Sequence, residues 1–173
     1  MENQANSKGI IINYGLYYSG VSILLSLVLY AMGKHLDDSF GIMALGFIIM
    51  TSFIVLGIKK FKSDNGGFVS WGQSVKIGVG IIVIGAILVI IYQQIFMTFI
   101  EPDFLAQMAE KTEQTLIDSG FTDEEIQMQM EMQKKFQTPL ISIPLTIVVS
   151  AFIGFVISAI AGAVLKKDEE EQY

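Results

Sequence analysis

The sequence contains no cysteine, so it offers neither a disulfide framework nor a thiol for redox or nucleophilic chemistry. Arginine is also absent, because all eleven basic residues are lysine. The bidentate recognition of phosphate or carboxylate by a guanidinium group is therefore excluded. With one histidine and neither an H-E-x-x-H nor a G-x-S-x-G motif, the chain has few groups suited to catalysis. We expect that it is not an enzyme and holds no cofactor.

Acidic charge is concentrated in one part of the chain. The net charge is −6, and nine acidic residues against three lysines between Glu101 and Thr138 account for all of it. A segment of this sign repels the phosphate backbone of nucleic acids. We therefore expect no nucleic acid among the partners.

Hydrophobic residues make up 52% of the chain and gather in four long runs. A run of about 20 apolar residues is long enough to cross the hydrocarbon core of a bilayer as a helix. The runs predict an all-α membrane protein with four transmembrane helices in a lipid bilayer. The predicted spans are Ile10–Met32, Phe40–Ile58, Val75–Ile100 and Pro139–Leu165, with an N-terminal tail at 1–9 and a charged C-terminal tail at 166–173.

A lysine-rich loop, residues 59–76, separates the second span from the third. It carries four lysines against the single acid Asp64. Short loops rich in lysine stay on the cytoplasmic side of a membrane. We therefore expect the loop and both termini in the cytoplasm, with residues 1–9 and 166–173 on the same side.

The same loop contains the most distinctive local motif of the chain. Gly66 and Gly67 predict a turn, because glycine adopts positive φ at no steric cost. Ser70 and Gln73 fit a capping box that opens the third helix, and Trp71 between them suits the headgroup level of a membrane. We treat these five residues as a loop motif of the protein.

Few polar side chains interrupt the apolar runs. Thr51 and Ser52 lie near the middle of the second span, and both hydroxyls are expected to bond to backbone carbonyls one turn earlier. Gln93 and Gln94 are adjacent amides in the third span, where each requires a hydrogen-bonding partner. We interpret them as interhelical bonding groups near the outer surface, with a substrate site as the alternative.

The acidic segment 101–138 predicts a helical hairpin outside the membrane, between the third and fourth spans. Apolar residues recur at helical spacing over 103–118, and a second helix extends from 123 to about 137. Thr122 and Glu125 form a second capping box at the start of that helix.

Methionines 128, 130 and 132 suggest copper, because thioethers are suitable ligands for Cu(I). Residues two apart in a helix point in nearly opposite directions, so only Met128 and Met132 share a face. We therefore favour adaptable packing over metal binding.

Small residues recur every four positions in the fourth span, at Ser150, Gly154, Ser158 and Gly162. In lipid, such a ridge allows the backbone of another helix to approach closely. The sequence leaves open whether that helix belongs to the same chain or to a second copy.

Three stretches carry a resemblance to a known family: the first span (NYGLYYSGVSILLSLVLYAMG), the loop GGFVSWGQSVKIG and the end of the third span (FIEPDFL). Together they resemble the small bacterial membrane proteins catalogued as domain of unknown function 4199, from about Tyr14 to Leu165. The resemblance implies the same fold and the bacterial inner membrane. It implies no catalytic residue, because the family has no established activity.

Two functions remain after an enzyme is set aside. The preferred one is a non-enzymatic scaffold or accessory subunit, whose partner is a second copy of the chain or another membrane protein. The alternative is a component of a small-molecule transporter or channel. It is less favoured, because ion-coupled carriers place charged groups inside the bilayer and these spans have none there.

Overall fold

The structure is a computed structural model of the chain that describes residues 6–37 and 39–167. This part is helical, with π-helical residues following α3. The elements are α1 (Ser7–Ala31), α2 (Phe40–Asp64), α3 (Trp71–Ile95), η1 (Phe96–Ile100), α4 (Phe104–Asp118), α5 (Asp123–Gln137) and α6 (Pro139–Leu165). Residues 1–5 of the predicted N-terminal tail and 168–173 of the C-terminal tail lie outside the described residues.

Among the described residues, four helices are long and apolar enough to cross a membrane: α1, α2, α3 together with η1, and α6. They coincide with the four predicted spans, which confirms the all-α class and four helices able to cross a membrane. The protein is a multi-pass membrane protein embedded in a lipid bilayer.

Two helices continue past the predicted bounds of their apolar spans. α1 begins at Ser7, inside the predicted tail 1–9, where the side chain of Asn6 accepts a 3.0 Å hydrogen bond from the backbone of Gly9. α2 continues to Asp64, so only residues 65–70 of the predicted loop 59–76 lie outside helices. Hydropathy marks the membrane-facing part of a helix, whereas lysine is itself a good helix former.

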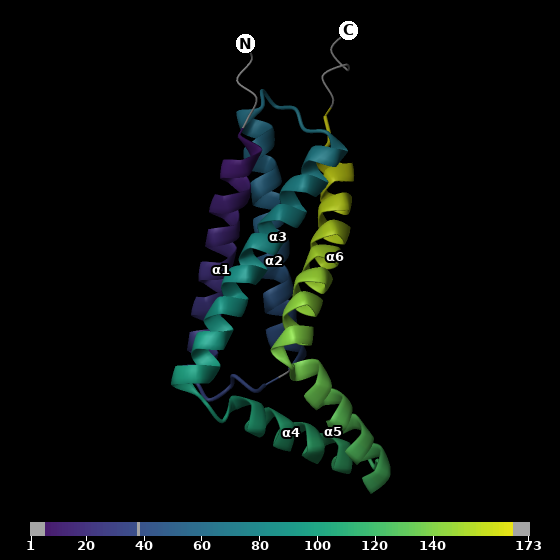
Figure 1. Cartoon of the computed structure of the whole chain (residues 1–173). Coiled ribbons are helices and arrows are strands. Elements are labelled where there is room, and N and C mark those ends of the chain that lie inside the picture. Colours follow the sequence, from purple (N-terminus) through teal and green to yellow (C-terminus); the bar gives the residue numbers. More distant parts are fainter. Residues whose placement is uncertain (1–5, 38, 168–173) are drawn as a thin grey trace. The chain divides into compact units, whose positions relative to one another are not determined.

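The chain divides into two compact units, and each is described by itself. The first unit contains α1, α2, α3 as far as Val89, and α6 from Ile147 onward (Figure 1). Within it, α3 is the most buried of the four apolar helices. Isoleucines of α2 and α3 dominate the core, where Ile54, Ile58, Ile77, Ile81 and Ile82 are almost completely buried.

The second unit, residues 90–146, contains the end of α3, η1, α4, α5 and the start of α6. α4 and α5 lie side by side as an antiparallel hairpin (Figure 1). The Gln133 side chain donates to Thr112 at 3.4 Å, and one turn further along α5 the Gln137 side chain donates to the Met108 sulfur at 3.9 Å. Gly120, with a φ of 80°, makes the turn between the two helices.

The start of α5 matches its prediction residue for residue. Thr122 caps the helix through the backbone N–H of Glu125, and the Glu125 carboxylate accepts from the backbone N–H of Thr122 at 2.9 Å. Both bonds of the predicted capping box are thus present. This box is formed entirely by neighbours in sequence, which is why the pattern alone located it.

Candidate functional site

The glycine-rich loop motif adopts the turn that its residues predict. Gly66 and Gly67 have φ values of 64° and 91°, a region that disfavours side chains with a Cβ. The Gln73 side chain accepts from the backbone N–H of Ser70 at 2.8 Å, and the Ser70 hydroxyl accepts from the backbone N–H of Gln73 at 3.2 Å. The motif therefore ends α2 and begins α3 within six residues.

This loop is bonded to the C-terminal end of α6. Val69 and Lys167 exchange two backbone hydrogen bonds of 3.1 and 3.0 Å, and the Val69 side chain is buried. The Trp71 indole donates to the carbonyl oxygen of Ala159 at 3.0 Å. The loop motif thus has a structural role, because it ties the α2–α3 connection to the last helix of the first unit.

The ridge of small residues on α6 lies against α3 of the same chain. A Cβ added at Gly162 would lie 2.8 Å from the Cβ of Ser74, and one added at Gly154 would lie 3.2 Å from the Cβ of Ile82. Between them, Gly78 is in close contact with Ser158. The two helices therefore approach at successive turns in antiparallel register. Ser150, the first residue of the ridge, is half-buried.

Ser74 and Gly78 on α3 form a second small-residue row that the sequence analysis did not single out. Their spacing of four residues is the same signal as the ridge on α6. Both are buried, and they face Gly162 and Ser158 respectively.

The two hydroxyls in the middle of α2 differ in their bonding. The Ser52 hydroxyl donates to the carbonyl oxygen of Ile48 at 2.7 Å, as predicted. The prediction was wrong for Thr51, because its Oγ1 is buried and has no hydrogen-bond partner among the described residues. Thr51 instead borders a groove between α2 and α6.

Gln93 and Gln94 border a cavity of about 300 Å³ in the second unit. Five elements contribute to its wall: the end of α3, η1, α4, the last residue of α5 and the start of α6. Uncharged polar groups share this wall with apolar side chains, among them Gln137, Ser142 and Thr146. The predicted interhelical hydrogen bonds of the two glutamine side chains are absent among the described residues, and both residues are exposed. The cavity suits a neutral solute that forms hydrogen bonds.

α5 presents an exposed apolar stripe to its surroundings. Met128, Met132 and Phe136 follow one another at four-residue spacing, and their exposures are 61%, 50% and 51%. The side of α5 that faces α4 carries Ile126 and Gln133 instead. In a helix with so many charged residues, an exposed apolar row of this kind is typical of a binding surface.

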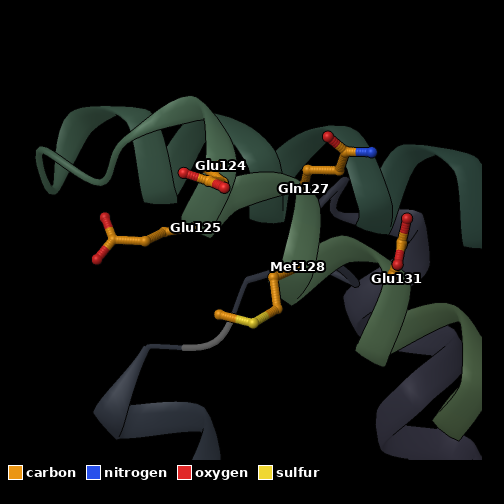
Figure 2. A pocket seen from close by; sticks show the side chains of 5 residues that line it. All are labelled: Glu124, Glu125, Gln127, Met128 and Glu131. Atoms are coloured by element: carbon orange, nitrogen blue, oxygen red, sulfur yellow. The ribbon is translucent and has the colours of Figure 1, made fainter.

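Acidic side chains border the stripe. A hollow of about 490 Å³ is lined by Glu124, Glu125, Gln127, Met128 and Glu131 (Figure 2). Bonds from the backbone and hydroxyl of Thr122 hold the pKa of the Glu125 carboxyl below its usual range. The rim of the stripe is therefore negatively charged at neutral pH. No group of three or more histidines, cysteines or acids in the described residues is arranged to hold a metal.

The comparisons with known proteins assign the family. A family profile described as "Protein of unknown function (DUF4199)" matches residues 13–167. The chain belongs to the DUF4199 family. Neither a search of curated proteins nor a search of solved structures gives a match.

The DUF4199 match confirms the resemblance inferred from the three sequence stretches. It extends from α1 to Lys167, so it includes the loop motif, the ridge on α6 and the stripe on α5. The stripe is the feature that the sequence analysis missed. Met128 and Met132 were placed on one face, but their continuation to Phe136 was the available signal.

Proposed function

We propose that this protein is a non-enzymatic scaffold or accessory subunit of the bacterial inner membrane, and that α5 binds a partner membrane protein. The observation that supports the proposal is the exposed stripe of Met128, Met132 and Phe136. Methionine and phenylalanine are enriched in the centres of protein interfaces. Flexible methionine side chains also adapt to the shape of a partner.

The charge around the stripe indicates which partner fits. Glu124 and Glu131 flank Met128 at the acidic hollow, and the predicted hairpin carries the whole net charge of the chain. A second copy of the hairpin would be repelled by like charge, as would an anionic lipid surface. The partner surface should therefore combine apolar side chains with basic ones.

The distribution of lysines supports a topology with the hairpin outside the cytoplasm. Seven lysines belong to the side assigned to the cytoplasm: Lys8, Lys59, Lys60, Lys62, Lys76, Lys166 and Lys167. Four belong to the other side: Lys34, Lys111, Lys134 and Lys135. In the first unit, the pairing of Val69 with Lys167 is consistent with a loop and a C-terminus on one side. The excess of lysine on that side follows the positive-inside rule.

A site-specific crosslink tests the proposed partner surface. A photoreactive amino acid at Met132 should crosslink in native membranes to one distinct membrane protein with a basic surface. Lys134 is the control position, because it is exposed on the same helix about 160° around from Met132 and does not line the acidic hollow. The yield at Lys134 should be several-fold lower.

A charge-reversal variant distinguishes a specific basic partner from nonspecific crosslinking. Glu131→Lys should lower the crosslink yield from Met132 several-fold, because the basic partner surface would then meet a like charge. Equal yields at Met132 and Lys134 would contradict the proposal. So would a crosslink to a second copy of the chain, or a yield unaffected by the reversal.

The cavity beside Gln93 and Gln94 supports a second candidate, a component of a small-molecule transporter or channel. Its wall is uncharged, so a neutral polar solute such as glycerol is the appropriate probe. Proteoliposomes should then swell in a glycerol gradient faster than empty liposomes. The double variant Gln93→Leu/Gln94→Leu should remove most of that difference. Identical swelling with and without protein would dismiss this candidate.

A further inference from the structure

The groove between α2 and α6 is a feature that the proposed partner surface does not use. Its volume is about 440 Å³. One wall is a row on α2 with one residue per turn: Phe47, Thr51, Val55 and Lys59. The other wall is formed by apolar residues of α6, including Ile160 and Val164, which are 63% and 79% exposed.

The length of the groove matches one leaflet of a bilayer. Phe47 and Lys59 are twelve residues apart, which corresponds to about 18 Å along the helix axis. Half of the hydrocarbon core of a bilayer is about 15 Å thick. A partner transmembrane helix would cover about twice this length, so the dimensions favour a single lipid chain.

The polar end of the groove is cationic. Lys59 is exposed, and its ammonium has no hydrogen bond or ion pair with any other described residue. Its two lysine neighbours differ, because Lys60 pairs with Asp64 at 2.7 Å and Lys62 donates to the carbonyl oxygen of Leu165 at 2.7 Å. No carboxylate lines the groove among the described residues.

We propose that this groove binds one acyl chain of an anionic glycerophospholipid, with Lys59 bonded to the phosphate of the headgroup. Phe47 and Val55 on α2 contact the acyl chain along one leaflet, together with the apolar residues of α6. The Lys59 ammonium then lies at the headgroup level, where a lysine binds phosphate as a point charge. Lys166 adds a second positive charge, since it directly follows the lining residue Leu165.

Native mass spectrometry of the full chain tests this assignment. The protein is released from nanodiscs that contain equal amounts of phosphatidylglycerol and phosphatidylcholine with the same oleoyl chains. We expect one phosphatidylglycerol retained at least fivefold more often than phosphatidylcholine. Lys59→Gln should abolish that preference, whereas Lys60→Gln, with the same loss of charge one residue away, should keep it.

A second pair of variants tests the binding of the acyl chain without changing the charge of the protein. Ala161→Trp fills the groove and should remove the retained lipid, whereas Phe152→Trp, at an exposed apolar position of α6 outside the groove, should not. Equal retention of both lipids would overturn the proposal, as would equal effects of Lys59→Gln and Lys60→Gln. Loss of a dimer in Ala161→Trp with the lipid retained would assign the groove to a second copy instead.

Discussion

The ammonium of Lys62 donates a 2.7 Å hydrogen bond to the carbonyl oxygen of Leu165, the last residue of α6. The last carbonyls of a helix have no partner within the helix, and the negative end of the helix dipole attracts a cation there. A lysine at the end of α2 therefore caps α6. This bond and the backbone pairing of Val69 with Lys167 both connect the α2–α3 region to the C-terminal end of α6.

Lys62→Met should destabilise the protein by about 1.5–3 kcal/mol, the range for a hydrogen bond to a charged group. The matched control is Lys60→Met, because the exposed pair of Lys60 with Asp64 contributes at most about 1 kcal/mol. Thermal unfolding in detergent, followed by circular dichroism, should show the larger fall in Tm for Lys62→Met. Equal falls would show that the Leu165 carbonyl does not depend on this lysine.

Gly78→Ala should destabilise the contact between α3 and α6. An added Cβ would collide with the Cβ of Ser158 and lie 3.0 Å from Cγ2 of Ile54, and neither atom ends a flexible side chain. Overpacking of this kind costs about 1–3 kcal/mol, which exceeds the roughly 1 kcal/mol that alanine gains over glycine in a helix. Gly46→Ala, with nothing within 4 Å, should be neutral or stabilising in the same thermal assay.

Thr122→Ala removes the N-cap of α5 and should cost about 1 kcal/mol of local stability. Amide hydrogen exchange over Asp123–Gln137 should then be roughly fivefold faster. Thr115→Ala is the control, because that hydroxyl bonds to the Lys111 carbonyl within α4. Rapid exchange of α5 already in the unmodified protein would mean that the helix is not stably formed in solution.

The stability of α5 should fall in acid because of Glu125. Its folded pKa lies below the usual value of about 4.3, since the bonds from Thr122 favour the carboxylate. A lowered folded pKa contributes stability above the unfolded pKa, and this stability is lost as the pH falls through the folded value. Exchange protection, corrected for intrinsic rates, should hold from pH 7 to about 5 and fall below about 4. Glu125→Gln should show a shallower fall.

The proposed topology predicts opposite labelling of two introduced cysteines. The chain has no cysteine of its own, so Ser63→Cys and Ser119→Cys give unique sites, and both serines are exposed. A membrane-impermeant maleimide should label position 119 on intact cells and position 63 only after the membrane is opened. The reverse pattern would place the hairpin in the cytoplasm.

The sequence by itself determined the membrane class, the four spans and the bounds of α5 within a residue. These features depend on residues that are close together in the sequence. Hydrocarbon offers no partner to a backbone amide, so an apolar run must satisfy its hydrogen bonds as a helix. A capping box such as Thr122 and Glu125 likewise depends only on residues three apart. Helix ends at polar residues were less accurate, as the continuation of α2 to Asp64 shows.

The tertiary structure alone decided which faces meet. Ser52 and Thr51 have the same chemistry and adjacent positions, but only Ser52 bonds to its own helix. From the sequence, the ridge on α6 could equally have packed against a second copy of the protein. In the structure it packs against Ser74 and Gly78 of α3. Such contacts join residues about 80 positions apart in the sequence. Small side chains would permit many alternative helix pairings. Close packing with the rest of the bundle selects one.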